Sequence, residues 1–590
     1  MGGVVLFLSL CLFARLVYLQ IIEHEHYQTL SKKNQLAFLP IPPKRGLIYD
    51  RNGVLIAQNM PVFTLELIPS QIANVDETIT ELQKLVDISP HELAVFQRLR
   101  KQTRRYDPVP LKLKLENSEV AKFYVNQFRF PGVFVQAQLI RYYPLGPAMA
   151  NVLGYVGRIN AYDLENIDQT QYVASNYIGK VGIEKYYERQ LHGRVGYQQV
   201  ETDASGQIVR VLERTQPKAG EDLTLTIDSN LQLAAQNALG DKRGAIIAIN
   251  PNNGEILAML SNPGYNSNLF VEGMSSLEYK ALQDSPDQPL FNRALRGQYP
   301  LASTIKPFMA LEGLLSKTIT ANDQIFDPGW YSVKHSSHKY RDWRKGGHGW
   351  VDVHKAIVVS CDTFFYDLAS NMGIDKIDDI LQKFGFGHAT QIDMGEELAG
   401  LVPTPDWKKQ HQGTPWYPGD TVISGIGQGY MLTTPLQLAN ATAILAKQGQ
   451  GYQPHLLLKT TPADGKPVQQ QPLALQKLNI PHRDWQTVID AMVGVIKSPV
   501  GTGYRFGKTA PYSVAAKTGT AQLVSESSRA ASDNVPTRLR DNSMFIAFAP
   551  VNKPQIAIAV VVENDPSAAN VARKVMDQYF AHQSTGKPTA

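Results

Sequence analysis

The chain has 590 residues, of which 43% are hydrophobic and 19% are charged. This composition excludes a disordered chain, and the length predicts two or three domains rather than a single core. The formal net charge of +5 is mildly basic, but no dense run of Lys and Arg accompanies it, so we do not expect nucleic acid as a partner.

Residues 1–22 are predicted to form a membrane anchor. The run is mostly apolar and about as long as the roughly 20 residues that cross a bilayer. Arg15 interrupts it near one end, where its side chain can reach the membrane interface beside Tyr18. No small-residue cleavage site follows, so we expect a retained anchor. The usual cytoplasmic cations are missing, so we expect the natural start upstream of Met1. A buried helix of a soluble protein is the alternative.

Residues 23–220 are predicted to form a second domain. Two β-type runs within 40–59 flank a turn that ends at Asn52-Gly53, which is typical of a hairpin. Helical patterns follow near 76–87 and 90–104. A second dense stretch of charged and small residues runs from Gly179 to Asp203. We give the charged side chains of both stretches an architectural role.

Residues 221–583 form the third predicted domain, and 584–590 a short tail. Helices are expected at 228–239, 436–445 and 567–582, and strands at 245–249, 255–260, 513–523, 545–549 and 556–562. Strands at both ends of the domain with helices between them predict one antiparallel sheet flanked by helices. The stretch from Gly425 to Gly429 lacks the spacing of a nucleotide-binding loop and is expected to be a structural loop beside the active site.

Ser303 and Lys306 form a Ser-x-x-Lys tetrad at the expected start of a helix. Residues three apart lie on one helix face, so the Lys306 amine can act as the base that a nucleophilic serine needs. Further tetrads begin at Ser336 and Ser584, so one tetrad alone is weak evidence. Two later motifs give the first its meaning: Ser360-Cys361-Asp362 and Lys517-Thr518-Gly519.

In this order the three motifs resemble those of the penicillin-binding protein and serine β-lactamase superfamily. The resemblance implies that Ser303 is the nucleophile, that Lys306 is its base and that Ser360 relays a proton toward the leaving amine. The Lys306 amine must be neutral to accept a proton, and burial and the nearby cation of Lys517 both favour a neutral amine. Substrate and oxyanion contacts would come from Asp362, Thr518, Gly519 and Thr520.

Two details of that site follow from the resemblance and from the residue types. The backbone N–H groups of Ser303 and Thr520 would form the oxyanion hole. Asp362 stands where many relatives carry asparagine. A carboxylate cannot donate a hydrogen bond as an amide can, so the bonding at this corner of the site is left open.

The two stretches at 45–57 and 179–203 resemble conserved boxes in the pedestal domain of class B penicillin-binding proteins, and the segment 326–349 resembles the elongation-type group, penicillin-binding protein 2. The implied fold is α+β. A transmembrane helix is followed by an elongated pedestal and by a transpeptidase domain of the penicillin-binding type, with a central antiparallel sheet flanked by helices.

Residues around the second motif are candidate metal ligands. The chain has two cysteines, and Cys11 in the anchor cannot plausibly pair with Cys361, so the Cys361 thiol calls for deep burial or a ligand. One thiolate, one imidazole and two carboxylates form a possible tetrahedral zinc set. That set, with which some members of the resembled group look able to bind zinc, is Asp327, Asp342, His348 and Cys361.

Zinc would act structurally, by holding the loop that carries Ser360 and Asp362. Rival ligands are His335, His338 and His354. The alternative is a buried free cysteine beside a surface loop.

The resemblance implies a peptidoglycan D,D-transpeptidase of lateral cell-wall elongation. It would acylate Ser303 with the penultimate D-alanine of one stem peptide, release the terminal D-alanine and pass the acyl group to an amine on a neighbouring strand. β-Lactams would be trapped on the same serine. The implied setting is the bacterial inner membrane, with one span and the bulk of the chain in the periplasm. The implied partners are a polytopic glycosyltransferase such as RodA and elongation scaffold proteins.

Several other functions can be weighed on the sequence. No glycosyltransferase-like acidic box precedes Asp222, and no Glu-x-x-Leu-Asn pattern supplies the deacylating base of a β-lactamase. A septal class B enzyme, a β-lactam sensor and an inactive scaffold are the remaining alternatives. The insertion between Asp327 and His348 argues against a septal enzyme. The lack of a visible cytoplasmic effector argues against a sensor, and the complete motif set argues against an inactive scaffold.

Overall fold

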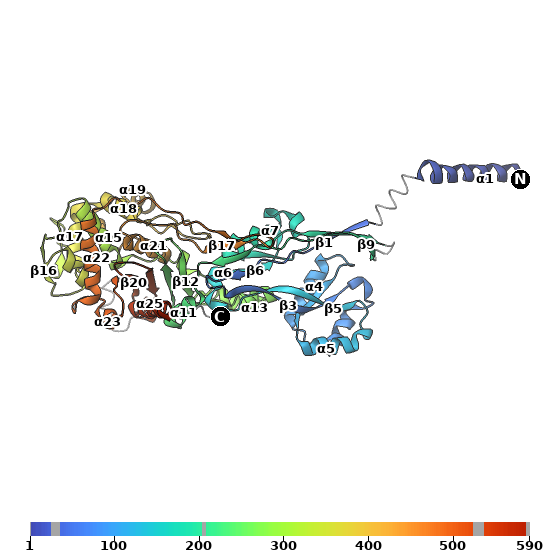
Figure 1. Cartoon of the computed structure of the whole chain (residues 1–590), viewed down its shortest axis with the longest axis horizontal. Helices are drawn as coiled ribbons and strands as arrows, with labels where there is room; N and C mark the ends of the chain where they lie inside the picture. The colour runs from blue at the N-terminus through green and yellow to red at the C-terminus, as the bar shows by residue number, and fades with distance from the viewer. Residues whose placement is uncertain (1, 25–35, 203–207, 523–535, 586–590) are drawn as a thin grey trace.

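The structure, a computed structural model, describes residues 2–24, 36–202, 208–522 and 536–585 (Figure 1). It confirms the predicted α+β architecture. The pedestal, defined here as residues 36–202 and 208–220, lies at one end of an elongated body, and the C-terminal domain from 221 onward lies at the other (Figure 1).

The N-terminal helix α1 (Gly2–Val17) continues into one π-helical turn, η1 (Tyr18–Ile22). The 21 residues from Gly2 to Ile22 are long and apolar enough to cross a membrane, and no part of this run is buried against other described residues. An apolar helix without protein cover needs an apolar environment of another kind, so the alternative of a buried soluble helix is wrong.

The pedestal is built from strands that pair across long stretches of sequence. The predicted hairpin joins β2 (Ile48–Tyr49) to β3 (Leu55–Leu67), with Gly53 at φ 86° in the turn. Residue Gly53 lies in the left-handed region, which explains why glycine follows Asn52 there. A separate three-stranded sheet has the order β1-β8-β9. Its strands are β1 (Leu36–Ile41), β8 (Gly196–Thr202) and β9 (Ile208–Thr215).

A small second core lies under the pedestal helices. Ser89 caps α4 (Pro90–Gln102) in a capping box with Glu92, and Phe96 of this helix is fully buried. It packs with apolar residues of β3, such as Leu65, and of α5, such as Phe123. The other elements of the pedestal are α3 (Val75–Leu82), β4 (Val109–Leu115), α5 (Asn117–Asn126), β5 (Val133–Tyr142), α6 (Ala150–Leu153), β6 (Tyr155–Arg158), α7 (Ala161–Asn166), α8 (Gln169–Tyr172), β7 (Tyr177–Val181), α9 (Gly182–Tyr186) and α10 (Glu188–His192).

One sheet crosses from the pedestal into the C-terminal domain. Its path is β18-β17-β10-β2-β3-β4, with β5 paired to β3. Three of these strands, β10 (Asp222–Leu225), β17 (Leu457–Thr461) and β18 (Val468–Gln469), follow residue 221 in the chain. The two predicted domains therefore share backbone hydrogen bonds, not only side-chain contacts.

The sheet of the C-terminal domain has five antiparallel strands in the order β12-β11-β21-β20-β19. They are β11 (Gly244–Ile249), β12 (Ile256–Asn262), β19 (Ala515–Ala521), β20 (Asn542–Ala549) and β21 (Ile556–Val562), so all five predicted strands are confirmed. Every residue of β20 and β21 is buried, which requires cover on both faces.

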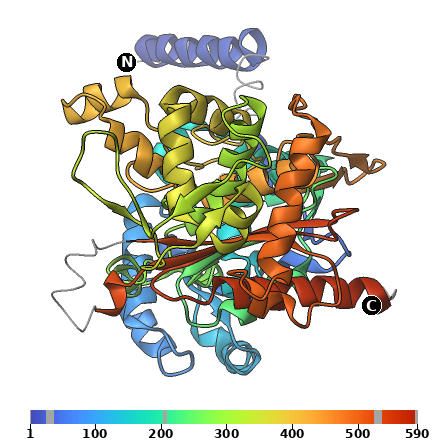
Figure 2. The same ribbon diagram turned by 90° about the vertical axis from the view of Figure 1, so that its left-hand side faces the viewer.

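Helices supply this cover. α11 (Ser229–Leu239) and α25 (Ala568–Thr585) pack together on one side, and α15 (Lys306–Leu315), α21 (Pro435–Ala446) and α22 (His482–Lys497) lie on the other (Figure 2). All three predicted helices are confirmed. Further elements near the site are α16 (Val353–Val359), α17 (Asp362–Met372), α18 (Ile374–Lys383), α19 (Pro405–Gln412), α20 (Pro418–Ser424) and α23 (Tyr504–Gly507), with the short strands β13 (Ile325–Asp327), β14 (Trp330–Tyr331), β15 (Tyr340–Arg341) and β16 (Gly349–Val351).

The charged residues of the two pedestal boxes bond to each other in the protein interior. Glu184 is fully buried and accepts hydrogen bonds from Arg45 Nε at 2.8 Å and Arg141 Nε at 2.6 Å. Burial raises the pKa of Glu184, but the charges of Arg141 and Arg45 outweigh it and lower that pKa below its ordinary value. This geometry supports the architectural role, which stays a prediction.

Replacing Glu184 with alanine leaves two arginines without their buried anion. We expect a loss of about 3–5 kcal/mol in the free energy of unfolding, since breaking one side of a buried ion pair is costly. Glu81→Ala is the control, because Glu81 pairs with Lys84 and Arg129 at the surface, where ion pairs contribute little. Thermal melting of the purified variants measures the difference, and equal melting temperatures would contradict the architectural role.

Candidate active site

The first motif lies at the junction of η5 (Ala302–Ile305) and α15, directly against the end of the central sheet. Ala302 has φ 49°, an unusual value for a residue with a side chain, and it turns the chain just before Ser303. The N–H of Ala302 donates to the carbonyl of Gly427 at 2.8 Å. A Cβ on Gly427 would come within 2.5 Å of the Ala302 carbonyl oxygen, so this loop needs glycine. The predicted structural role of the 425–429 loop is confirmed.

Two buried lysine amines converge on the hydroxyl of Ser360. Lys306 Nζ donates to Ser360 Oγ at 3.2 Å and to the Ser360 carbonyl at 2.9 Å. Lys517 Nζ donates to the same Oγ at 2.8 Å. Both lysines are fully buried, and Ser360 sits at φ 58° in the left-handed region between α16 and α17. The structure thus brings together one residue from each of the three motifs, Lys306, Ser360 and Lys517. Ser303 lies three residues before Lys306, in η5.

The pKa of Lys517 is well below its ordinary value. Burial is the larger cause, and the charge of Lys306 is the second, while the charge of Asp362 opposes both. The lowered pKa thus falls on Lys517, whereas the sequence led us to expect it on Lys306; the neutral Lys306 amine stays a prediction.

The side-chain carboxylate of Asp362 accepts two hydrogen bonds. Its Oδ1 accepts from Lys306 Nζ at 2.7 Å, and its Oδ2 accepts from the backbone N–H of Trp343 at 3.2 Å. Both neighbours are hydrogen-bond donors, and a carboxylate offers each of them an acceptor oxygen. The amide of an asparagine would instead face one of these donors with its NH₂ group. The question that the sequence left open is answered by the residues that face Asp362.

The third motif lies on β19, which is an edge strand and so has one row of unpaired backbone groups. Thr518 Oγ1 is 2.8 Å from Thr502 Oγ1, Thr520 is exposed, and Gln428 Nε2 donates to the Thr520 carbonyl at 3.2 Å. A Cβ on Gly519 would approach Thr304 Cγ2 to 2.9 Å, so glycine allows the strand to lie close to the first motif. The oxyanion hole of Ser303 and Thr520 stays a prediction.

Three residues at the site were not singled out from the sequence. They are Trp343, Thr502 and Gln428, which contact Asp362, Thr518 and Thr520. Gln428 lies inside the predicted loop 425–429, and the expected position of that loop beside the active site could have pointed to it. No sequence signal marks Thr502.

Of the two other Ser-x-x-Lys tetrads, the one at Ser336 lies on an exposed turn, and the side chain of Ser584 is outside the described residues.

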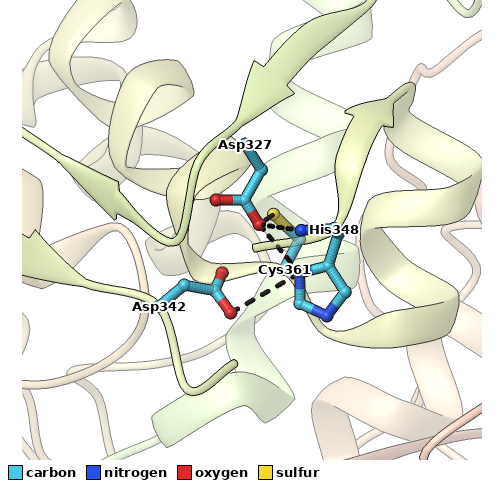
Figure 3. Close-up of side chains that lie close together, drawn as sticks. All are labelled: Asp327, Asp342, His348 and Cys361. Atoms are coloured by element: carbon cyan, nitrogen blue, oxygen red, sulfur yellow. Dashed lines mark hydrogen bonds and ion pairs between the residues drawn. The ribbon is translucent and has the colours of Figure 1, made fainter. Parts of the chain in front are cut away.

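The four predicted metal ligands form one buried cluster beside the second motif (Figure 3). One ligand atom from each of Asp327, Asp342, His348 and Cys361 lies within 4.8 Å of the others. His348 Nδ1 is 2.8 Å from Asp327 Oδ2 and 3.5 Å from Asp342 Oδ1, and Cys361 Sγ is 3.4 Å from Asp327 Oδ2. Ligand atoms in a tetrahedral zinc site with bonds of about 2.0–2.3 Å lie about 3.3–3.7 Å apart. Two of these three distances fall in that range and the His348–Asp327 distance is shorter, and the donor set is one that zinc accepts.

The charges of this cluster also call for a cation. Burial, and then the charge of Asp342, raise the pKa of the Cys361 thiol. Burial and the charge of Asp362 raise the pKa of Asp342. Anionic groups that are costly to ionise in the protein interior become favourable ligands once a divalent cation neutralises them. The rival histidines, His335, His338 and His354, are exposed and stand outside the cluster.

The cluster is connected directly to the catalytic residues through the start of α17. Asp342 Oδ2 accepts from the backbone N–H of Asp362 at 2.6 Å and of Thr363 at 3.1 Å. Cys361 Sγ accepts from the N–H of Phe364 at 3.5 Å. Two of the candidate ligands therefore cap the helix whose first residue is Asp362.

Two family models match the chain. The penicillin binding protein transpeptidase domain matches residues 244–580, and the penicillin-binding protein dimerisation domain matches residues 40–225. The first range contains all three motifs, and the second contains both pedestal boxes.

Relatives match along almost the whole length. The chain is 44% identical over 583 residues to the peptidoglycan D,D-transpeptidase MrdA of Acinetobacter baumannii, covering 98% of this chain and 86% of the relative. Among solved structures it is similar to penicillin-binding protein 2 of Helicobacter pylori in its complex with MreC, with a TM-score of 0.81, 32% identity, and 93% and 99% of the two chains covered. A chain of a peptidoglycan synthase complex that coordinates polymerization and crosslinking matches with a TM-score of 0.72 at 27% identity over 98% of each chain.

Removing the charge of Lys306 tests the electrostatic coupling of the two lysines. In Lys306→Met one of the causes that lower the pKa of Lys517 is gone, so that pKa is expected to rise toward its ordinary value. Lys306→Arg is the matched control, because it keeps the positive charge. The side-chain resonances of labelled lysine, followed by NMR against pH, report the shift. An identical titration of Lys517 in both variants would contradict the coupling.

Proposed function

The chain belongs to the elongation-type class B penicillin-binding proteins and is a peptidoglycan D,D-transpeptidase, and we propose that Ser303 is the nucleophile of that reaction. The observation that carries the proposal is the position of Ser303 in η5, three residues before a buried lysine that begins α15 and shares the Ser360 hydroxyl with Lys517. The substrates are stem peptides of peptidoglycan.

Acylation begins when Ser303 Oγ attacks the carbonyl carbon of the penultimate D-alanine. Its proton moves to the Lys306 amine, which must first be neutral. The Ser360 hydroxyl joins the two amines, so a proton on Lys306 can pass through it to Lys517, whose pKa is lowered. A proton held by either amine is then within reach of the Ser360 hydroxyl for the next step.

The oxyanion that forms on the attacked carbonyl lies between the backbone N–H groups of Ser303 and Thr520. Collapse of this intermediate expels the terminal D-alanine, whose amine takes a proton from Ser360. The open edge of β19 and the hydroxyl of Thr518 would hold the substrate carboxylate before that step. A second amine then attacks the ester on Ser303 and completes the crosslink.

The setting and the partners are part of the same proposal. The candidate span Gly2–Ile22 anchors the chain in the bacterial inner membrane, and the remainder lies in the periplasm, where peptidoglycan is crosslinked. Similar proteins have been solved in complex with MreC and in a synthase complex that polymerizes and crosslinks, which supports a scaffold protein and a polytopic glycosyltransferase of the RodA type as partners of this chain.

We also propose that Asp327, Asp342, His348 and Cys361 hold a structural zinc ion. The buried set of one sulfur, one nitrogen and two oxygen donors supports this assignment. When bound, zinc would neutralise the cluster and fix the ligands in place, without a role in bond making. Held in this way, Asp342 and Cys361 keep α17 capped, and Asp362 stays within reach of Lys306.

The nucleophile is tested by intact-mass measurement of the detergent-solubilised chain after incubation with benzylpenicillin, followed by peptide mapping. We expect one lasting adduct on the peptide that contains Ser303, and none in Ser303→Ala. Ser336→Ala, which removes the serine of a second Ser-x-x-Lys tetrad, is the control and should be labelled like the natural chain. An adduct on another residue, or none, would refute the assignment and favour a scaffold. A transient adduct with bulk hydrolysis of the drug would indicate a β-lactamase.

The zinc proposal is tested by metal analysis and by melting. Chelation of the purified chain should remove one equivalent of zinc, lower the melting temperature by about 5 °C or more and slow acylation by penicillin, because the ligand energy is part of the folding energy. Cys361→Ser should behave like the chelated chain, whereas Cys11→Ser should keep the metal. Unchanged melting and acylation after chelation would refute the proposal.

A further inference from the structure

Four exposed aromatic side chains gather in one segment at the end of the body opposite α1. Phe326 is 57% exposed, Trp330 39%, Trp343 59% and Trp350 62%. They belong to the segment 325–355, which contains β13 to β16; Figure 1 places β16 at this end, and Figure 2 views the molecule from it. Three of the six tryptophans of the chain are therefore exposed here. Large apolar side chains that are exposed together mark an interaction surface.

The buried cluster beneath these rings holds their backbone in place. Phe326 precedes Asp327 on β13, and successive side chains of a strand point to opposite faces, so the buried Asp327 directs Phe326 outward. Trp350 lies directly opposite Phe326 on β16, with ring centroids 5.6 Å apart at an angle of 69°. Trp343 follows Asp342, another member of the cluster. A surface that is fixed in this way loses little entropy when it binds a ligand.

Trp343 connects this surface to the rim of the catalytic site. Its indole N–H donates to the carbonyl of Val359 at 3.1 Å, at the end of α16 and next to Ser360. Trp350 lies just before the start of the same helix, which has seven residues and is therefore about 10 Å long. The aromatic side chains thus follow α16 away from the second motif.

The same segment is strongly basic at its surface. Its carboxylates are Asp327 and Asp342, which are buried in the cluster, and Asp352, which is partly exposed and caps α16. All of its lysine and arginine side chains are exposed: Lys334, Lys339, Arg341, Arg344, Lys345 and Lys355. These six cations and the four aromatic side chains are called the aromatic–basic surface below. Its charge is complementary to that of a polyanion.

We propose that the aromatic–basic surface binds strands of the existing peptidoglycan wall. The inference rests on the transpeptidase function and goes beyond it, since this surface extends outside the catalytic cleft. Peptidoglycan offers sugar rings, whose C–H faces pack against aromatic side chains, and stem-peptide carboxylates, which pair with exposed cations. A hold on the polymer beside the second motif keeps the wall within reach of the site while single stem peptides come and go.

The position of the surface favours the wall over an anionic membrane as its ligand. The aromatic–basic surface and the candidate span Gly2–Ile22 lie at opposite ends of the elongated body (Figure 1). With the span in the inner membrane, the body holds this surface away from lipid headgroups and toward the wall. Partners that meet the chain at the membrane approach it from the other end.

The test measures binding of the full-length chain in detergent to purified sacculi by co-sedimentation. The chain is first acylated with benzylpenicillin, so that capture in the active site does not contribute. Trp350→Ala and the double variant Arg344→Gln/Lys345→Gln should each weaken binding about 10-fold, because each removes an anchor of the surface. Added salt should weaken binding of the natural chain more than that of the double variant.

Matched variants on the pedestal are the controls. Tyr106→Ala removes an aromatic ring that is 79% exposed, and Arg104→Gln/Arg105→Gln removes two adjacent exposed cations; both should bind sacculi like the natural chain. Acylation by benzylpenicillin should be the same in all of these proteins.

Three results separate the surface from the function on which it rests. Equal sacculus binding by Trp350→Ala and the natural chain, or no binding by the natural chain, would overturn the proposal. Tighter binding to phosphatidylglycerol vesicles than to sacculi, weakened by the same variants, would assign the surface to a membrane and would also overturn it. A natural chain that is not acylated would refute the nucleophile assignment, and its binding to sacculi would still decide on the surface.

Discussion

The catalytic site depends on a hydroxyl group shared by two buried amines. Ser360 Oγ lies 3.2 Å from Lys306 Nζ and 2.8 Å from Lys517 Nζ, and water reaches neither lysine. Two ammonium groups in such a space would repel each other without the screening that water provides. The site therefore favours a state in which only one of the two amines is charged. The Asp362 carboxylate, 2.7 Å from Lys306 Nζ, is the counter-charge to the two amines. The reactivity that we propose for Ser303 would depend on this arrangement rather than on any property of the serine itself.

The arrangement in turn depends on the start of α17. Asp362 is the first residue of that helix, and its own N–H is bonded to Asp342. Asp342 and Cys361 belong to the buried cluster beside the second motif, so the cluster, the helix cap and the lysine pair form one connected series of contacts. On the other side of the body, the pedestal is joined to the C-terminal domain by the pairing of β2 with β10 and by buried contacts such as Asp50 with Ser229. A displacement of the pedestal must therefore break backbone hydrogen bonds in a shared sheet.

Much of this could be predicted from local sequence patterns. The strands at 244–249 and 256–262 flank a turn that the sequence marks, and Thr434 marks the start of α21, where it forms a capping box. The four candidate metal ligands, chosen from their residue types, form one cluster. The shared sheet was not predicted, because pairing of β17 with β10 joins residues more than 200 positions apart and leaves no local period. For a similar reason, the sequence did not predict that Trp343, Thr502 and Gln428 belong to the site. Each is an ordinary residue type in its own segment and becomes part of the site only through the tertiary fold.

The position of the cluster outside the catalytic cleft has an electrostatic consequence. Asp342 and Asp362 lie close enough for the charge of Asp362 to raise the pKa of Asp342. If both carboxylates and the Cys361 thiol were ionised without a cation, their field would stabilise protonated lysines and oppose the deprotonation that acylation requires. A protonated Asp342 would avoid that field, but it would be a weaker acceptor for the N–H groups that it caps at the start of α17. The zinc ion that we propose for this cluster would remove the conflict, since Asp342 would stay ionised as a cap while the field at Lys306 would be reduced. In that case a metal beside the site, and not in it, would matter for chemistry in which it forms no bond.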